Sequence, residues 1–304
     1  MIIKKEKKGD ITVYHVKKNY DDDKMKQKMS TFIKPSDIDI ILTHSADVYT
    51  EEGNLLLRFR KNAISNKEHI TQFYDNIIKF AQNVTNNRGN ASGKKKSEDG
   101  SNAKVMTNIF GYFDKWGPSQ KFIFKRLGKT PKISVRECRF NMEWPEQYKK
   151  TIPMIQDIDK LYEKLTPEQY KLQRKKADET HFKIPDTAFT TITTNVNYQT
   201  SIHTDKGDDA EGFGNLAVIE QGEYTGGETC FPQYGVGVDV RTGDVLFMNV
   251  HLPHANLPIK KKTKDTKRLS IVCYLRERVW KLTKGKSRKV YERHNKTVKK
   301  MLKK

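Results

Sequence analysis

The chain has 304 residues, of which 35% are hydrophobic and 31% are charged. That length suits one large domain or two modest ones, and 14 Phe and 13 Tyr residues exclude wholesale disorder, because aromatic side chains carry much of a buried core. Its 58 Lys and Arg residues against 37 Asp and Glu residues give a net charge of +21, which favours nucleic acid or another polyanion as a partner, although a lysine-rich composition bias predicts the same excess.

The sequence excludes an integral membrane protein and a protein held together by disulfides. No stretch approaches the ~20 apolar residues that a spanning helix needs, and the N-terminus lacks the apolar run of a secretory signal. The cysteines (Cys138, Cys230 and Cys273) are odd in number and form no Cys-x-x-Cys pair, which excludes a disulfide scaffold and a zinc finger. The sequence therefore predicts an intracellular protein in a reducing compartment. It indicates no membrane and no particular protein partner.

Residues 1–103 are predicted as an N-terminal region of unassigned role. Within it, a helix is predicted over His69–Val84, because apolar residues recur there at helical spacing (Ile70, Phe73, Ile77, Phe80 and Val84). Residues 86–103 contain no aromatic or branched apolar side chain and are rich in Gly, Ser and Asn. That composition predicts a flexible linker.

Residues 104–280 are predicted as one α+β domain. Short strands are expected over Phe122–Phe140, and two helices over Thr151–Leu165 and Pro167–Lys176. After residue 187, short β-branched runs alternate with Gly, Pro, Asp and Asn, which predicts a jelly-roll, or double-stranded β-helix, core over residues 187–280 with flanking helices.

The segment 281–304 is predicted as a basic C-terminal tail. It holds 11 Lys and Arg residues and one acidic residue, Glu292, and its few apolar residues could form a weak helix. A solvated tail and an arm that grips phosphates are both consistent with this composition.

A metal-binding pattern begins with His203-Thr-Asp205, at the end of a predicted strand. Residues i and i+2 of a strand face the same side, so an imidazole and a carboxylate can reach one ion. Further along, Gly243-Asp244 opens an apolar strand that runs into His251-Leu-Pro-His254. Two His and one Asp on one face of an octahedron form the facial triad of non-haem Fe(II) oxygenases, which leaves three positions open.

Arg268 extends this pattern, because it starts the next apolar strand, RLSIVCYL. A guanidinium can hold the distal carboxylate of a 2-oxo acid in bidentate fashion, and Ser270 shares the strand face of Arg268 and can add a hydroxyl donor. A core histidine beside a salt-bridged arginine is the structural alternative. The agreement of HxD, GD, His and Arg in order favours the metal site.

The stretches FTTITTNVN, HTDKGD, GFGNLAVIEQGEYTGGE and GDVLFMNVHLPH, with VRECRFNMEWPEQY upstream, resemble the TET/JBP family. This family of Fe(II)/2-oxoglutarate dioxygenases has the double-stranded β-helix fold and oxidises the 5-methyl group of pyrimidines in DNA. The resemblance covers about residues 133–280. It implies Fe(II) bound by His203, Asp205 and His254, and 2-oxoglutarate held by Arg268.

The resemblance also implies roles for three further positions. Asn195 matches an asparagine that touches the co-substrate in related nucleic-acid dioxygenases. Asp208 matches a polar position that reads an extruded base, although a turn residue is an equal interpretation. His251 competes with His254 for the third ligand position. His254 is preferred, because it lies beyond the strand and is followed by Ala255-Asn256.

The resulting hypothesis is a hydroxylase of 5-methylcytosine or thymine in double-stranded DNA, located in the nucleus of a eukaryotic or viral system. One alternative keeps the iron but changes the substrate to RNA, an N-alkylated base or a protein side chain. Another uses ascorbate as co-substrate to modify 5-methylcytosine, as a related family member does. The third is a non-catalytic jelly roll that binds nucleic acid.

Overall fold

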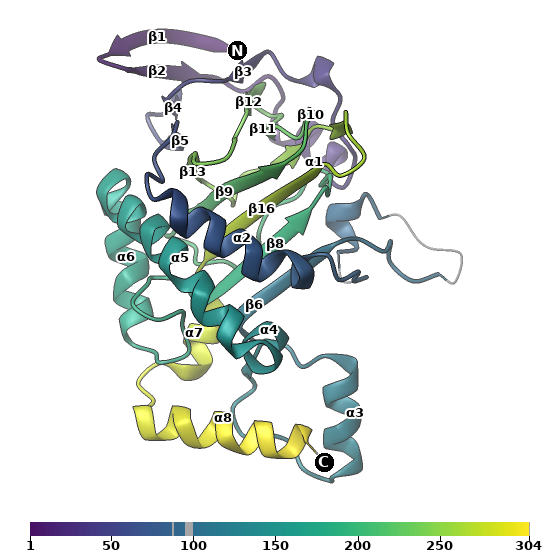
Figure 1. Ribbon diagram of the computed structural model, residues 1–304. Coiled ribbons are helices and arrows are strands. Elements are labelled where there is room, and N and C mark those ends of the chain that lie inside the picture. The colour runs from purple at the N-terminus through teal and green to yellow at the C-terminus, as the bar shows by residue number, and fades with distance from the viewer. Residues whose placement is uncertain (87, 95–99, 304) are drawn as a thin grey trace. The chain divides into compact units, whose positions relative to one another are not determined.

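The computed structural model describes residues 1–86, 88–94 and 100–303, and they form two compact units (Figure 1). Unit 1 comprises residues 1–108, 194–206 and 213–272, and unit 2 comprises residues 109–193, 207–212 and 273–304. The predicted domain boundaries at residues 103 and 280 remain predictions. Part of the predicted linker, residues 87 and 95–99, lies outside the described residues.

The strands of the chain are mostly short, as the sequence predicts for its C-terminal half. In chain order they are β1 (Ile2–Lys8), β2 (Ile11–Val16), β3 (Ile40–Leu42), β4 (Ala46–Thr50), β5 (Leu55–Arg60), β6 (Thr107–Phe113), β7 (Arg136–Glu137), β8 (Thr191–Val196), β9 (Gly214–Gln221), β10 (Tyr224–Thr225), β11 (Thr229–Phe231), β12 (Val236–Val238), β13 (Val245–Met248), β14 (Ala255–Asn256), β15 (Lys260–Lys261) and β16 (Lys267–Tyr274).

Helices occur in the N-terminal region, in the middle and at the C-terminal end of the chain. They are α1 (Asp22–Lys28), α2 (Lys67–Ala81), α3 (Pro118–Arg126), α4 (Arg139–Glu143), α5 (Pro145–Leu165), α6 (Pro167–Asp178), α7 (Glu277–Thr283) and α8 (Arg288–Leu302), with short 3-10 turns at Pro35–Asp37 and Asn90–Ser92.

Unit 1 is built from two facing sheets. The larger sheet runs in the order β1-β2-β4-β5-β13-β9-β16-β8-β6-β7, of which β6 and β7 fall mostly or wholly in unit 2, and the smaller one runs in the order β14-β11-β12-β3. One apolar cluster joins them: Val48, Phe59 and Leu246 come from the larger sheet, and Phe231 and Val236 come from the smaller one, all at most 1% exposed. Side chains alternate between the two faces of a strand, so each sheet contributes its inward face to this shared core.

The N-terminal region is an integral part of these sheets, a role that its sequence did not predict. Strand β5 pairs antiparallel with β13, with Phe59 opposite Leu246, and β3 pairs in parallel with β12, with Ile40 opposite Val236. Both pairings join residues about 190 positions apart along the chain. Local sequence patterns carry no information about such partners, which is why the region had no assigned role.

Unit 2 packs its helices around aromatic side chains. Phe182 lies at the centre of one cluster, with ring centroids 5.6 Å from Tyr112 and 4.9 Å from Tyr291 in edge-on geometry. Trp116 and Phe124 form a second cluster with Val298 of α8. Edge-on aromatic pairs fix the orientation of neighbouring elements as well as burying area.

The three helices that apolar periodicity and capping residues predict are present, but each differs from its predicted bounds. Helix α2 begins two residues before the predicted start and ends at Ala81, so Val84 is 59% exposed. Helix α5 begins at Pro145, six residues before the predicted start, because Pro145 occupies the favourable first helical position. Helix α6 extends to Asp178, two residues beyond its predicted end.

The expectation of strands over Phe122–Phe140 is wrong for most of that segment. Helix α3 occupies Pro118–Arg126, α4 begins at Arg139, and only Arg136–Glu137 is a strand. Gly117 and Pro118 start α3, and Phe124 is the buried residue that anchors it. A single anchor in a nine-residue helix produces no readable 3.6-residue pattern.

None of the described helices is both long and apolar enough to cross a bilayer.

Candidate active site

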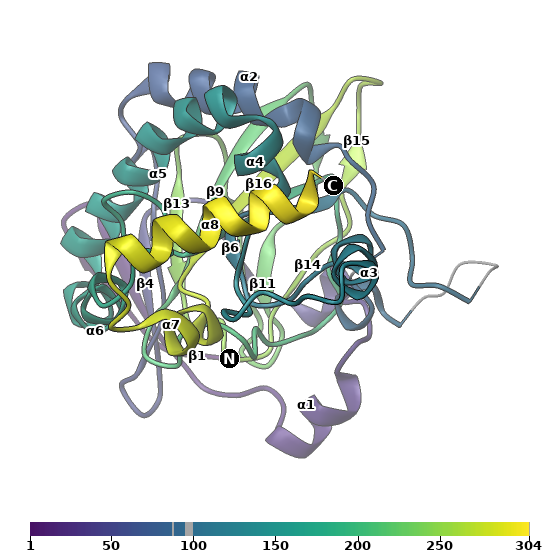
Figure 2. The same cartoon turned by 90° about the horizontal axis from the view of Figure 1, so that it is seen from below.

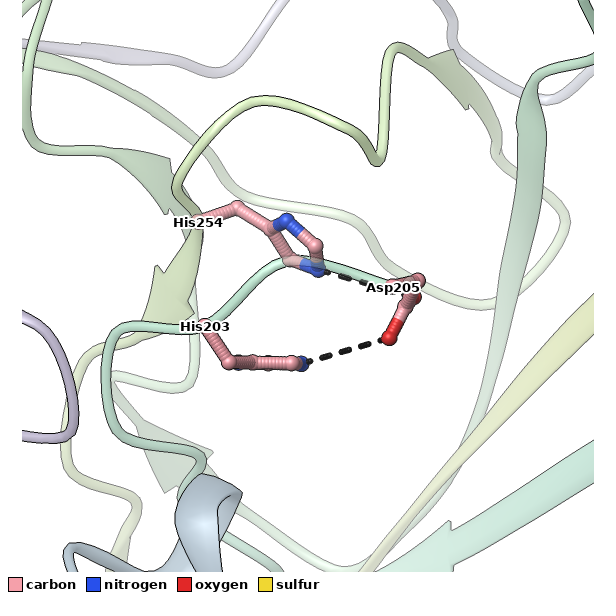
Figure 3. Close-up of side chains that lie close together, drawn as sticks. All are labelled: His203, Asp205 and His254. Carbon is pink, nitrogen blue, oxygen red and sulfur yellow. Dashed lines mark ion pairs between the residues drawn. The ribbon is translucent and has the colours of Figure 1, made fainter. Parts of the chain in front are cut away.

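Three side chains that are distant in sequence meet in unit 1. His203 and Asp205 follow β8, and His254 directly precedes β14 (Figure 3). An antiparallel bridge joins the two histidines: the backbone N–H of each donates to the carbonyl oxygen of the other at 3.0 Å. The backbone N–H of Asp205 donates to the carbonyl of Val250, also at 3.0 Å. The main chain therefore fixes the positions of all three residues.

The side chains converge through their donor atoms. His203 Nε2 lies 3.8 Å from Asp205 Oδ1, and His254 Nε2 lies 3.7 Å from Asp205 Oδ2. The three ligand atoms, one from each residue, all lie within 4.8 Å of one another. A single cation bound between them would contact all three, and two imidazoles with one carboxylate are the donor set of the facial Fe(II) triad.

Backbone carbonyls fix the tautomers of both histidines. His203 Nδ1 lies 2.7 Å from the carbonyl oxygen of Ser201, and His254 Nδ1 lies 2.9 Å from that of Leu252. A carbonyl only accepts, so each Nδ1 carries the proton and donates it. Each Nε2 then presents a lone pair toward the shared centre. This is the usual outer-shell arrangement of metal-binding histidines.

Electrostatics favour the same protonation states. Burial, followed by the neighbouring His254, lowers the pKa of His203 to about 4, which leaves the ring neutral near neutral pH. Burial alone would raise the pKa of Asp205, but the neighbouring His254, His203 and Arg88 together outweigh it and the pKa is lowered. A neutral imidazole next to an ionised carboxylate is the state that binds a cation.

Arg268 is a buried cation in β16 and is 3% exposed. Its Nη2 atom has no hydrogen-bond partner among the residues that the structure describes, and neither has the hydroxyl of Tyr224. Burial lowers the pKa of Arg268, while Tyr224 opposes that shift. A buried guanidinium nitrogen without a partner is costly, and a carboxylate would supply the missing acceptor. The Arg268 site therefore fits an anionic co-substrate.

The turn Gly226-Gly227 makes room for Arg268. A Cβ on Gly227 would lie 3.0 Å from Arg268 Cδ, and one on Gly226 would lie 1.9 Å from the carbonyl oxygen of Pro258. Both glycines have positive φ, +81° and +80°. Close approach and backbone conformation both require glycine here.

We expect Gly226→Ala to destabilise the protein far more than Gly53→Ala. Both positions have φ of +81°, but nothing lies within 4 Å of a Cβ at Gly53. The left-handed conformation costs each alanine about 1–2 kcal/mol. The collision with Pro258 adds about 1–3 kcal/mol at Gly226. Urea unfolding of both variants measures the difference, and equal losses would show that the Pro258 contact is not tight.

Asn195 and Ser270, the other two residues predicted to contact the co-substrate, form a hydrogen bond with each other. Asn195 Nδ2 donates to Ser270 Oγ at 3.2 Å, and the hydroxyl of Thr107 donates to Asn195 Oδ1 at 2.6 Å. Arg88 Nε donates in turn to Thr107 Oγ1 at 3.2 Å, and its charge contributes to the lowered pKa of Asp205. Sequence reasoning missed Arg88 and Thr107, because neither belongs to a spaced motif.

Asp208 lies in unit 2, on a short loop of residues 207–212. Its backbone forms a bridge with Arg276, and the N–H of Asp209 donates to the carbonyl of Leu275 at 2.9 Å. Arg276 Nε donates to Asp114 Oδ1 at 2.8 Å, and a Cβ on Gly207 would lie only 1.5 Å from Arg276 Nη1. The loop is therefore closely packed against Arg276, which sequence reasoning did not single out.

His251 lies outside the group of three ligating side chains found among the described residues. Its backbone N–H donates to Asn249 Oδ1 at 3.1 Å. The structure brings His254 to His203 and Asp205, and the assignment of His254 as the third ligand stays a prediction that this geometry supports.

Two facing sheets with an HxD…H group between their strands define a class of protein, the double-stranded β-helix oxygenases. A family model described as the oxygenase domain of the 2OGFeDO superfamily, Tet_JBP, matches residues 123–277, just over half of the chain. The chain belongs to the TET/JBP family. That membership confirms the predicted family and implies Fe(II) and 2-oxoglutarate as cofactors.

Relatives with assigned names share this region. The chain is 33% identical over 183 residues to the bifunctional helicase and thymine dioxygenase JBP2 of Trypanosoma cruzi. The aligned segment covers 60% of this chain and 16% of that protein. It is 32% identical over 173 residues to the thymine dioxygenase JBP1 of Trypanosoma brucei brucei. Here the aligned segment covers 56% of this chain and 19% of that protein. The chain thus spans less than a fifth of the length of these relatives.

A solved structure supports the fold over nearly the whole chain. NgTET1 in complex with 5mC DNA matches with a TM-score of 0.55 and 14% sequence identity, over 92% of this chain and 90% of that chain. This likeness confirms the predicted α+β fold with a double-stranded β-helix core. It extends well beyond the residues matched by the family model, in line with the N-terminal strands found in the sheets of unit 1.

Proposed function

We propose that this chain is an Fe(II)- and 2-oxoglutarate-dependent dioxygenase that hydroxylates the 5-methyl group of a pyrimidine in double-stranded DNA. The convergence of His203, Asp205 and His254 in a member of the TET/JBP family carries the proposal. The names of the relatives, thymine dioxygenases, and the 5mC DNA in the NgTET1 complex support thymine and 5-methylcytosine as the candidate bases.

Each predicted site residue has a proposed task. His203, Asp205 and His254 hold Fe(II), and Arg268 pairs with the distal carboxylate of 2-oxoglutarate. When bound, Fe(II) supplies the O₂ chemistry that couples decarboxylation of 2-oxoglutarate to hydroxylation of a C–H bond. Ser270 and Asn195 offer polar groups to the co-substrate.

The DNA substrate imposes further requirements. A methyl group inside a duplex cannot reach a buried metal, so the base must be flipped out at a cost of a few kcal/mol. Asp208, three residues after Asp205, is proposed to accept a hydrogen bond from the flipped base. The net charge of +21 supports binding to the phosphate backbone, which offsets part of that cost. A DNA substrate also implies a nuclear location in a eukaryotic or viral system.

Mass spectrometry of nucleosides tests this proposal. The protein is incubated with Fe(II), 2-oxoglutarate and duplexes that contain thymine alone or thymine with 5-methylcytosine. We expect a hydroxymethyl nucleoside and an equal amount of succinate, both dependent on 2-oxoglutarate. Succinate formation with RNA or peptide but not with DNA would contradict the proposed substrate. Product that requires ascorbate in place of 2-oxoglutarate would contradict the proposed co-substrate.

A further inference from the structure

The C-terminal helix α8 is strongly basic and firmly packed. Figure 2 shows it running across unit 2, with α3 beside its C-terminal end. Val298 of α8 packs on Trp116 and Phe124, and His294 Nε2 lies 2.7 Å from the carbonyl oxygen of Val135. These contacts fix one face of the helix. The opposite face is therefore presented in a defined orientation, which an unstructured tail could not do.

Lysines gather on the outward side of α8. Lys296, Lys299, Lys300 and Lys303 line an open groove of about 650 Å³, together with Tyr291, Glu292 and Asn295. Lysines 296 to 303 span about 10 Å along the helix axis at 1.5 Å per residue. One strand of duplex DNA presents about three phosphates over that distance, at roughly 3.4 Å each. The spacing of the lysines thus fits a phosphate backbone.

Nearby acidic residues in the described part of the chain neutralise only one of these four lysines, Lys299. Glu292 pairs with Arg288 at 2.9 Å, and Glu137 pairs with Lys299 at 3.0 Å. Among the residues that the structure describes, no ion pair involves Lys296, Lys300 or Lys303. Three ammonium groups on one helix face repel each other, and a polyanion relieves that repulsion.

A lysine-rich composition alone does not explain this pattern, as a second helix in unit 2 shows. Helix α5 carries four lysines and four acidic residues, and Lys149 pairs there with Glu146 at 2.9 Å. Helix α8 carries six Lys and Arg residues and one acidic residue. The excess of positive charge on α8 is thus larger than on α5, and α3, which packs on α8, likewise carries three Lys and Arg residues and no acidic residue.

We propose that the lysine face of α8 (Lys296, Lys299, Lys300 and Lys303) is a second DNA-contact surface, which binds the phosphates of duplex DNA regardless of sequence. The proposal rests on the proposed DNA substrate and adds a contact outside the metal site. Its role is to hold the protein on the duplex. Because phosphates carry no sequence information, this surface contributes affinity and salt dependence but no choice of base.

Binding of a short unmethylated duplex at a series of NaCl concentrations, followed by fluorescence anisotropy, tests the surface. The variant Lys296→Gln/Lys299→Gln/Lys300→Gln/Lys303→Gln should reduce the slope of log affinity against log salt concentration by about 2.7, since about three phosphates lie within the span of these lysines and each contact contributes about 0.9. The matched control replaces the four exposed lysines of α5 by Gln (Lys149, Lys150, Lys160 and Lys164) and makes the same change in charge. It should leave the slope nearly unchanged.

An unchanged slope in the α8 variant, or an equal reduction in the α5 control, would overturn the second surface while leaving the proposed function intact. A wild-type protein that binds no duplex would overturn both. Phosphatidylserine vesicles test a membrane as the alternative partner. If the wild-type protein bound the vesicles and no duplex, and the α8 variant no longer bound the vesicles, DNA would be overturned as the partner of this surface. Circular dichroism of each variant checks that its helical content equals that of the wild-type protein.

Discussion

Asp205→Ala is expected to abolish specific Fe(II) binding and hydroxylation while leaving the fold intact. Asp205 is the only anionic member of the group, and its carboxylate oxygens lie 3.8 and 3.7 Å from the Nε2 atoms of His203 and His254. Loss of an outer-shell partner alone lowers metal affinity by about 10–100-fold, so loss of a direct ligand should cost at least about 100-fold. Anaerobic titration calorimetry with Fe(II) measures the affinity.

The two candidate histidines provide a matched pair for the same measurement. His254→Ala should lose Fe(II) affinity as Asp205→Ala does, because His254 bridges to His203 and directs Nε2 at Asp205. His251→Ala should keep one Fe(II) per chain, since His251 lies outside the described ligand group. The reverse result, with His251 needed and His254 dispensable, would show that His251 and not His254 is the third ligand.

Arg268→Gln is expected to raise the KM for 2-oxoglutarate by about 30- to 1000-fold. Removing one partner of a buried charge pair costs about 2–4 kcal/mol, and each 1.4 kcal/mol is tenfold in affinity. The unpartnered Nη2 of Arg268 supplies the specific reason, because a bound carboxylate would be its acceptor. Steady-state kinetics with varied 2-oxoglutarate and fixed DNA give the KM, and the KM for DNA should change little.

Arg241→Gln is the control for Arg268. Arg241 stacks on the ring of Tyr224, with its guanidinium carbon 4.4 Å from the ring centroid, so it is a neighbouring cation, although its side chain is 27% exposed and Arg268 is 3% exposed. It is already paired with Glu220 at 2.9 Å and Asp239 at 2.6 Å, which leaves it less able to bind an anion. An equal rise in KM for both variants would show that general positive potential, rather than Arg268 itself, attracts 2-oxoglutarate.

The candidate metal-binding group could be predicted from sequence because its chemistry uses few residue types at a short, fixed spacing. The i, i+2 rule for strands predicts that His203 and Asp205 face one side, whereas in the structure β8 ends at Val196 and His203 forms an isolated bridge with His254. Choosing between His251 and His254 needed more, since both flank the same turn. The backbone bridge between His254 and His203 separates them, and that bridge is a long-range pairing.

The contacts that sequence could not predict all depend on such long-range pairing. Arg88 comes from a polar segment with no periodicity, yet it reaches Asn195 through Thr107. Arg276 bonds to Asp114, 162 residues away, and packs against Gly207. Strand β3 pairs with β12 and β5 pairs with β13, and each of these partners lies far along the chain. Residue patterns report local periodicity and composition, and they carry no record of which distant partner completes a sheet.

Anomalous diffraction at the iron edge, from crystals grown anaerobically with Fe(II), tests the central claim most directly. We expect one strong peak per chain, bounded by His203 Nε2, His254 Nε2 and a carboxylate oxygen of Asp205. A peak at any other place, or iron held without one of these three side chains, would contradict the proposed metal centre.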